Sequence, residues 1–302
     1  MKYAVVIPAK NEQDSIGETL LSIVNQSLAP QICIVVDDGS TDRTPAIVKS
    51  FAERYEQVRY HKNENRENYK VGGHVVEVFN IGKGLIDQQN ISYDFIIKMD
   101  ADLSFERDFM QRIFEKHGRE DQLGIVSGTP WYYQDGKKVF EYSPIWHTHG
   151  QFKIYNRQCL LEMGGIKQML GWDCADNIQA IEAGWKTLAT RDINYLMHRR
   201  IGNKSSLIKG RINQGKGAYN LRYDPFYMII KLLHDLFKPP YVVGSLVYLY
   251  GYVKSMMNGK KTRLSKQQRK ILRKMLWSSF LERAQSGRFF LFQVAKRQLK
   301  AR

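Results

Sequence analysis

The segment Ile32-Cys-Ile-Val-Val-Asp-Asp-Gly-Ser-Thr-Asp42 joins a run of mostly β-branched residues to a polar loop. Its apolar part, Ile32 to Val36, has the length and composition of a strand that is buried on both faces in a parallel sheet. Similar runs occur at Tyr3 to Ile7 and at Phe95 to Met99. Each run ends at a polar cluster, so the three clusters are expected together at one edge of the sheet.

Helical patterns separate these predicted strands. Apolar residues recur at helical spacing over 16–24, directly after Ser15, which opens a capping-box pattern. Further helices are predicted after Thr41 or Asp42 and over about residues 73–89. Alternation of strands and helices predicts an α/β fold with a doubly wound, mostly parallel sheet, in which ligands bind beyond the carboxyl ends of the strands.

The C-terminal part of the chain has a different, helical character. Helices are predicted over residues 226–237, over 241–257, and after a capping residue at Ser265. The sequence therefore predicts two parts, residues 1–223 with the α/β sheet and residues 224–302 as a helical, strongly basic extension.

The net charge of +16 is concentrated at the C-terminus. Residues 258–302 contain 14 Lys or Arg and a single acid, Glu282, which accounts for +13 of the total. The apolar stretch 241–257 is at the lower limit for spanning a bilayer and is expected to be buried or interfacial. A basic segment beside such a helix predicts peripheral attachment to an anionic inner membrane surface. The alternative is that the basic residues form a solvent-exposed face that only increases solubility.

The cysteines and the N-terminus indicate a reducing, cytoplasmic location. Cys33, Cys159 and Cys174 are odd in number and lack the spacing of a zinc site or a disulfide framework. Residues 1–9 show no charged and then apolar pattern of a secretory leader.

Asp100 and Asp102 lie one residue apart where the strand Phe95 to Met99 ends. Their side chains can converge only if the chain turns there, as a strand-to-loop junction allows. Two carboxylates at such a junction suit Mg²⁺ or Mn²⁺ shared with a diphosphate.

Several motifs occur in a fixed order along the chain. They are Ile-Pro-Ala-Lys-Asn-Glu (7–12), Asp-Asp-Gly-Ser-Thr-Asp (37–42), Lys-Met-Asp-Ala-Asp (98–102), Gly-Trp-Asp-Cys-Ala-Asp (171–176), Glu-Ala-Gly-Trp-Lys-Thr (182–187) and His-Arg-Arg (198–200). Together these motifs resemble family 2 glycosyltransferases with the GT-A fold, closest to bacterial members of surface-polysaccharide or glycolipid assembly, and the resemblance covers about residues 1–225.

The resemblance implies an inverting transfer from a UDP-, GDP- or dTDP-sugar to a glycan or lipid-linked acceptor, assisted by a divalent metal. It implies metal ligands at Asp100 and Asp102, with His198 completing the metal shell or reaching the diphosphate. The positions to which it carries nucleotide binding are Pro8, Ala9, Glu12, Asp37 or Asp38, Gly39 and Asp100.

A carboxylate near a helix start is expected to accept the proton of the attacking hydroxyl. Family members place an acidic pair before this helix, whereas Cys174 stands where the second acid is usual. Asp176 is the preferred base and Asp173 the alternative, and one of the two is expected to cap the helix instead.

Other polar and aromatic residues carry weaker expectations. Cations near the donor phosphates are candidates for offsetting leaving-group charge, and a cluster of aromatic residues and histidines is a candidate acceptor surface. The cations are Arg66, Lys70, Arg199, Arg200 and Arg211, and the cluster is Trp131, Tyr132, Trp146, His147 and His149.

Two competing functions start from other features. The basic tail with its aromatic residues Trp277, Phe280, Phe289 and Phe290 would suit a nucleic-acid-binding protein, but that function leaves the strand-end motifs unexplained, so no nucleic acid partner is expected. A nucleotidyltransferase that makes nucleotide sugars would share the sheet and the metal pair. It would need a Gly-rich basic loop after the first strand, and none is present.

Overall fold

The computed structural model describes residues 1–64, 73–117, 120, 122–198, 207–236, 241–259 and 263–285. The chain divides into two compact units, each described by itself. Unit 1 comprises Met1–Gln168 and Trp172–Ile201, and unit 2 comprises Met169–Gly171 and Gly202–Arg302.

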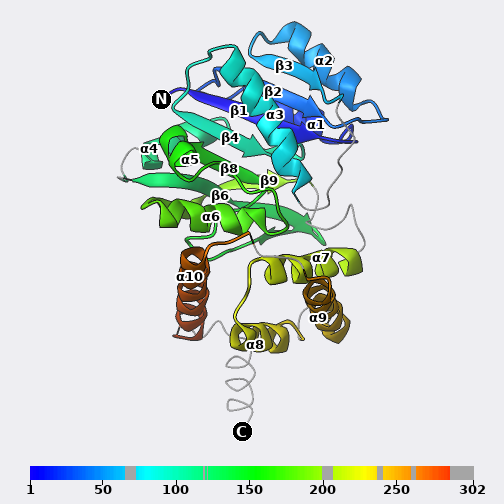
Figure 1. Ribbon diagram of the computed structural model, residues 1–302. Coiled ribbons are helices and arrows are strands. Elements are labelled where there is room, and N and C mark those ends of the chain that lie inside the picture. Colours follow the sequence, from blue (N-terminus) through cyan, green and yellow to red (C-terminus); the bar gives the residue numbers. More distant parts are fainter. Residues whose placement is uncertain are drawn as a thin grey trace. The chain divides into compact units, whose positions relative to one another are not determined.

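Unit 1 is built on one mixed sheet whose described strands run in the order β3-β2-β1-β4-β8-β6-β9-β5, with β7 paired to β6 (Figure 1). The first four strands of this order are mutually parallel, and the three strands predicted from the apolar runs are confirmed as β1, β2 and β4. The strands are β1 (Tyr3–Ala9), β2 (Ile32–Asp37), β3 (Val58–Lys62), β4 (Phe95–Met99), β5 (Leu103–Ser104), β6 (Leu123–Gln134), β7 (Lys137–Phe140), β8 (Phe152–Asn156) and β9 (Lys186–Met197).

The other half of the sheet mixes strand directions. Strand β8 runs antiparallel to both β4 and β6, while β6 and β9 are parallel to each other. The short β5 returns antiparallel to the end of β9, pairing Leu103 with Met197. An α/β fold with flanking helices is thus confirmed, and the sheet is parallel in its N-terminal half and mixed in the remainder.

Helices cover both faces of the sheet because side chains of each buried strand alternate between its faces. In β1, Val5 and Ile7 belong to the core cluster that includes Ile16 of α1. Val6 points to the other face, where Gly82 of α3 approaches it. The helices of unit 1 are α1 (Ile16–Val24), α2 (Thr44–Arg54), α3 (His74–Gln88), α4 (Phe109–His117), α5 (Arg157–Glu162) and α6 (Trp172–Glu182).

Two cap predictions had different outcomes. Ser15 does not cap α1, because its hydroxyl donates to the carbonyl oxygen of Ala101 at 3.1 Å, so the capping-box prediction is wrong. Ser265 does cap its helix, since Oγ accepts a hydrogen bond from the amide of Gln268 at 3.0 Å.

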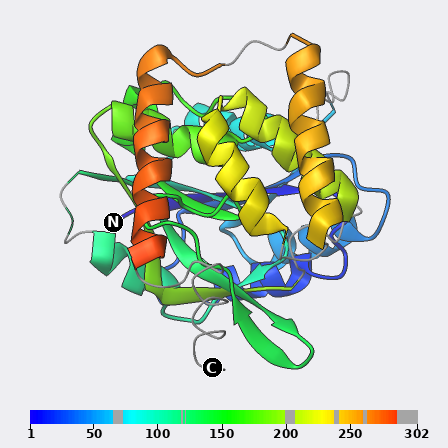
Figure 2. The ribbon, with the colours of Figure 1, turned by 90° about the horizontal axis from the view of Figure 1, so that it is seen from below.

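Unit 2 is helical, and Figure 2 shows α9 (orange) and α10 (red-orange) as its long helices. Helix α7 lies before residue 223, yet it belongs to unit 2 because it packs closely on α9. The compact units therefore divide near residue 201, ahead of the sequence boundary at 223. The helices are α7 (Leu207–Asn220), α8 (Pro225–Asp235), α9 (Tyr241–Met257) and α10 (Lys266–Gln285).

Two glycines of α7 form a matched pair for testing this packing. A Cβ at Gly215 would lie 1.9 Å from the carbonyl oxygen of Tyr248, whereas a Cβ at Gly210 would meet nothing within 4 Å. We expect Gly215→Ala to lower the free energy of unfolding by about 1–3 kcal/mol through overpacking. Gly210→Ala should raise it by up to about 1 kcal/mol through helix propensity. Urea unfolding followed by circular dichroism measures both, and equal effects would contradict the packing.

Candidate functional site

Asp100 lies where β4 ends and the chain turns toward β5. Its amide donates to the carbonyl oxygen of Gln151 at 2.8 Å, and its side chain is 38% exposed. The Nζ of Lys98 contacts Oδ1 of Asp100 and also donates to the carbonyl oxygen of Gly150 at 2.7 Å. Asp100 is thus an accessible carboxylate, held by a lysine that is itself almost fully buried.

Asp102 and His198 face each other across the ladder between β5 and β9. The amide of His198 donates to the carbonyl oxygen of Asp102 at 2.9 Å, so the residues predicted as metal ligands lie at the same end of the sheet. The His198 ring has other partners: Nε2 lies 2.6 Å from Oγ of Ser104, and Nδ1 lies 3.4 Å from a carboxylate oxygen of Glu18.

These residues fit a divalent metal through carboxylates, the oxygen ligands that Mg²⁺ and Mn²⁺ prefer. Asp100 is accessible and Asp102 is half-buried beside it in the turn. Within the described part of the chain, no three His, Cys, Asp or Glu side chains converge as a metal site. A metal held here would therefore draw remaining ligands from its bound diphosphate or water.

The loops after β1 and β2 are tied to each other. Pro8 and Ala9 pair with Val36 and Asp37 in the parallel ladder, and Ala9 accepts a hydrogen bond from the Asp38 amide at 2.8 Å. Two more hydrogen bonds connect these loops. The Glu12 amide donates to Oγ1 of Thr44 at 2.7 Å, and the Thr41 amide donates to Oδ1 of Asn11 at 2.8 Å. The predicted nucleotide-binding residues of both motifs are therefore brought together.

Asp37 and Asp38 have different surroundings. Asp37 stabilises the turn, because its carboxylate accepts the Ser40 amide at 2.8 Å and the Tyr60 hydroxyl at 2.9 Å. Gly39 lies within this turn at φ 78°, a left-handed conformation that favours glycine.

Asp38 is held by side chains that the sequence did not indicate. Its Oδ1 accepts a hydrogen bond from Nδ2 of Asn63 at 3.0 Å, and its Oδ2 lies 2.6 Å from Nε2 of His74. The other ring nitrogen of His74 lies 3.3 Å from Glu77. Since His74 opens α3 and Asn63 follows β3, only the sheet topology brings them to Asp38.

Asp176 lies in the core of unit 1. Both of its carboxylate oxygens are 2.7 Å from Nζ of Lys153, and the Tyr155 hydroxyl donates to it at 2.6 Å. Asp176 and the Lys153 side chain are both fully buried. Burial raises the pKa of the Asp176 carboxyl, while Lys153 and Tyr155 act in the opposite direction. Full burial and these contacts suit a structural role for Asp176 better than that of a base that meets a substrate hydroxyl.

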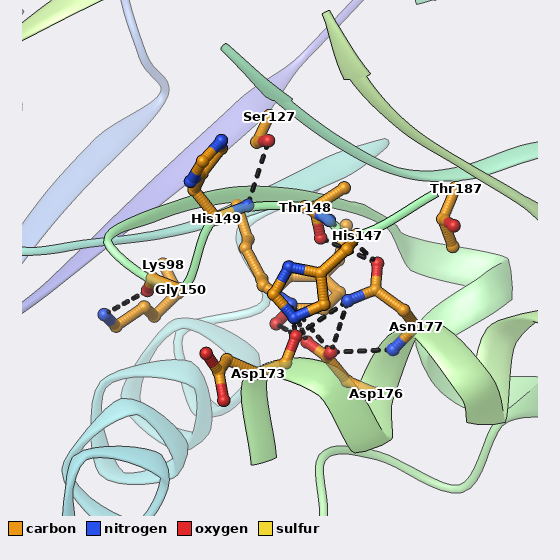
Figure 3. A network of polar contacts seen from close by, with 12 residues as sticks. Lys98, Ser127, His147, Thr148, His149, Gly150, Asp173, Asp176, Asn177 and Thr187 are labelled. Atoms are coloured by element: carbon orange, nitrogen blue, oxygen red, sulfur yellow. Dashed lines mark hydrogen bonds and ion pairs between the residues drawn. The ribbon is translucent and has the colours of Figure 1, made fainter. Parts of the chain in front are cut away.

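Asp173, one turn earlier in α6, is half-buried, and its carboxylate lies apart from the hydrogen bonds of the Asp176 carboxylate (Figure 3). A Cβ at Gly150 would lie 3.0 Å from Cβ of Asp173. Gly150 is also the residue whose carbonyl accepts Lys98, the partner of Asp100. Asp173 is thus linked to Asp100 through two intervening residues.

The buried network fixes the first turn of α6. Lys153 Nζ donates to the carbonyl oxygen of Asp173 at 2.7 Å, and so does Nδ2 of Asn177, also at 2.7 Å. Asn177 in turn accepts the Thr148 hydroxyl at 2.8 Å (Figure 3). The network therefore positions Asp173 relative to the loop before β8.

Most of the predicted acceptor aromatics are core residues. Tyr132, Trp146 and His149 are each less than 10% exposed. Trp131 is half-buried beneath Nζ of Lys138, which lies 3.8 Å from its ring centroid. Among these residues, half-buried Trp131 and His147 retain exposed surface.

The remaining candidates belong to unit 2 or lie outside the described residues. Arg211 belongs to unit 2, where it lies 3.5 Å from Asp235. Arg66, Lys70, Arg199, Arg200, Phe289 and Phe290 lie outside the described residues.

A family model described as "Glycosyl transferase family 2" matches residues 4–175, which is more than half of the chain. The chain belongs to glycosyl transferase family 2. The match includes the loops after β1, β2 and β4, and it ends within α6, two residues after Asp173.

Curated proteins with similar sequences are bacterial glycosyltransferases. The 4,4'-diaponeurosporenoate glycosyltransferase of Staphylococcus haemolyticus is 28% identical over 50% of this chain and 36% of its own length. GlyA of Streptococcus pneumoniae is 24% identical over 53% of this chain and 21% of its own length. Poly-beta-1,6-N-acetyl-D-glucosamine synthase of Staphylococcus aureus is 25% identical over 40% of this chain and 26% of its own length. The matches thus span well under half of these relatives.

Solved structures of glycosyltransferases share the fold of this family 2 chain. The mannosyltransferase PcManGT of Pyrobaculum calidifontis, in complex with GDP-Man and Mn²⁺, aligns with a TM-score of 0.54 at 18% identity, covering 97% of this chain and 82% of its own. TarS of S. aureus, residues 1–349 with UDP-GlcNAc, aligns with a TM-score of 0.53 at 16% identity, covering 85% and 73%. These likenesses establish the GT-A fold.

The pH dependence of stability tests the burial of His149 in the loop before β8. Burial, followed by the charges of His147, Lys153 and Arg191, lowers the pKa of His149 from 6.5 to about 3. The unfolded chain therefore binds a proton below about pH 6.5 that the folded chain excludes, so the protein loses stability as the pH falls. From pH 6.5 to 5 this histidine should remove about 2 kcal/mol from the free energy of unfolding.

We expect His149→Gln to reduce that acid sensitivity, measured as the difference between urea unfolding free energies at pH 7.5 and pH 5. The control is His61→Gln, which replaces a half-buried histidine of β3. An unchanged pH dependence in His149→Gln would contradict the assignment.

Proposed function

We propose that this family 2 chain is an inverting glycosyltransferase that moves a sugar from a nucleoside-diphosphate donor to an acceptor hydroxyl in polysaccharide or glycolipid synthesis. One observation carries the proposal. It is the closeness of half-buried Asp173 to Gly150, whose carbonyl oxygen accepts a hydrogen bond from Lys98, the partner of Asp100, and this supports a carboxylate of α6 near the strand-end motifs. Neither a nucleic-acid-binding protein nor a nucleotidyltransferase accounts for this arrangement and for the family match together.

The donor is proposed to be a UDP-, GDP- or dTDP-sugar. Support comes from the fold-related PcManGT with GDP-Man and TarS with UDP-GlcNAc. The nucleoside would lie against the joined loops after β1 and β2, where Asp38 is oriented by Asn63 and His74. Pro8, Ala9, Glu12, Asp37 and Gly39 would form the rest of that surface.

Mg²⁺ or Mn²⁺ is proposed to bind at Asp100 and Asp102, and the Mn²⁺ in the PcManGT complex supports this choice. When bound, such an ion offsets the negative charge that develops on the leaving diphosphate. His198 would join this group by exchanging its contacts with Ser104 and Glu18. Lys98 would keep Asp100 oriented from below.

Asp173 is proposed as the base in place of Asp176. Its carboxylate would accept the proton of the acceptor hydroxyl while the hydroxyl oxygen forms a bond to the anomeric carbon. The bond from that carbon to the diphosphate oxygen breaks on the opposite side, which inverts the configuration. The Asp176–Lys153 pair acts only by positioning, because Lys153 holds the Asp173 carbonyl.

The acceptor is proposed to be a glycan or a lipid-linked sugar, and the enzyme is proposed to work at the cytoplasmic face of the cell membrane. The relatives named above for 4,4'-diaponeurosporenoate and for poly-beta-1,6-N-acetyl-D-glucosamine support such acceptors. The basic segment 258–302 would be attracted to anionic lipid. Among the described residues, no helix combines the length and the apolarity needed to cross a membrane.

Calorimetric titration with UDP, GDP, dTDP and CDP, each with and without Mn²⁺, tests the donor site. We expect one nucleotide to bind in a metal-dependent manner and Asp102→Ala to abolish the metal dependence, because one of the two ligand carboxylates is lost. Asp108→Ala, which removes an exposed carboxylate near α4, is the control and should bind like the wild type. Absence of binding in every combination, with a gel shift on nucleic acid that persists with nucleotides, would overturn the proposal.

Two substitutions in α6 separate catalysis from positioning. Asp173→Asn should keep the free energy of unfolding and nucleotide binding near wild type, while kcat falls about 10²- to 10⁴-fold because the proton acceptor is missing. Asp176→Asn leaves the buried Lys153 without its carboxylate and should lower the free energy of unfolding by about 3–5 kcal/mol. Unfolding curves and initial rates with the identified donor measure both. Full activity of Asp173→Asn would contradict its role as base.

A further inference from the structure

Helix α9 presents most of its large apolar side chains outward, whereas its inward face consists of small residues and one tyrosine. The buried positions are Gly244, Ser245, Tyr248, Gly251 and Ser255, which share one face at helical spacing. A water-exposed helix has the opposite pattern, with apolar residues toward the core. The exposed large apolar residues on the outward face include Val242 (53%), Leu246 (60%), Leu249 (39%), Tyr250 (52%), Met256 (51%) and Met257 (80%).

Packing against α7 fixes this orientation of α9. A Cβ at Gly251 would lie 2.1 Å from the carbonyl oxygen of Ile212, so only glycine fits the contact. Any side chain at position 251 would separate the two helices at this contact. Of the large residues of α9, Tyr248 is buried, and most of the others lie on the outward face.

Helix α8 also exposes an apolar face, although its inward face carries large residues as well. Its inward residues Met228 and Leu232 contact α9, through the Tyr248 hydroxyl and Ser245 respectively. The exposed residues Phe226, Ile229 and Leu233 follow one another at intervals of three and four, which places them on one face.

Carboxylates are excluded from the surface of these helices. Residues 207–259 contain only Asp224 and Asp235 as acids, and both side chains are about one-tenth exposed or less. Asp224 pairs with Arg273 at 3.0 Å, and Asp235 pairs with Lys231 at 2.5 Å. Lys209 and Lys254 are exposed on α7 and α9. The exposed surface of this part is therefore apolar and cationic.

We propose that the outward faces of α8 and α9 lie in the interfacial layer of an anionic lipid bilayer, with both helices parallel to the membrane plane. An apolar helix face beside lysines, with tyrosine at its margin, suits the boundary between acyl chains and anionic headgroups. Cationic charge without exposed carboxylate complements an anionic surface better than it complements a second copy of the same surface. The proposal deepens the membrane placement proposed above, and it does not depend on sugar transfer.

Vesicle flotation of the full chain tests the proposal, with vesicles of phosphatidylcholine alone and with 30% phosphatidylglycerol. We expect binding to the anionic vesicles and weaker binding to the neutral ones. Leu246→Gln with Leu249→Gln should lower the partition coefficient about 100-fold, since each buried leucine contributes roughly tenfold. The matched control is Leu161→Gln with Tyr133→Gln, which replaces apolar residues of unit 1 that are 58% and 66% exposed, and it should change binding less than about twofold.

A label measurement keeps the test independent of folding defects. Cys33, Cys159 and Cys174 are buried, so an environment-sensitive dye can be attached selectively to Leu249→Cys or, as control, Leu161→Cys. Anionic vesicles should shift the dye emission to the blue at position 249 and not at position 161. Absence of a shift at 249, or equal binding of both double variants, would overturn the proposal. So would a stable dimer in the wild type that Leu246→Gln with Leu249→Gln converts to monomers.

Discussion

The buried ion pair of Lys153 and Asp176 is the constraint on which the site depends. Removing two charges from water is costly, and the attraction between them offsets that cost only when further hydrogen bonds satisfy both groups. Here Tyr155 donates to the carboxylate and the Asp173 carbonyl accepts from the ammonium. Since loss of either partner would leave a buried charge unpaired, the pair holds the first turn of α6 against β8. These contacts determine the position of Asp173, the proposed base.

A second buried lysine, Lys98, lies beside Lys153 and contacts Asp100. Lys98 and Lys153 are neighbours across the β4–β8 ladder, and their ammonium groups lie 5.3 Å and 5.4 Å from the ring centroid of Trp172. One lysine holds Asp100 and the other holds Asp176. Both ammonium groups lie within cation–π distance of the Trp172 ring, which stabilises two buried like charges that repel each other. The antiparallel insertion of β8 thus connects the turn of Asp100 and Asp102 to α6.

The features predictable from sequence are those with a local signal. The apolar runs of β1, β2 and β4 and the basic C-terminus needed no long-range information, and the length of α9 was predicted to the residue. Asp173 and Asp176 are one turn apart, and spacing alone does not tell which of them faces the core, so the burial of Asp176 could not be predicted. A lysine inside the apolar run Phe152–Tyr155 was the available signal for a buried carboxylate partner. The His74–Asp38 contact had no such signal, since 35 residues and a sheet crossover separate the two positions.

Helix α9 shows why composition also misleads when orientation is unknown. Its composition predicts a helix that is either buried or interfacial, and the packing of unit 2 buries its small residues and Tyr248 while most of the other large residues stay exposed. Exposed valine, leucine and methionine side chains gain nothing from water, so an apolar environment outside the protein stabilises the same conformation that backbone contact with α7 selects. The two faces of this helix therefore suit two different environments. Gly251 permits the close packing on α7, and the outward apolar residues suit contact with lipid.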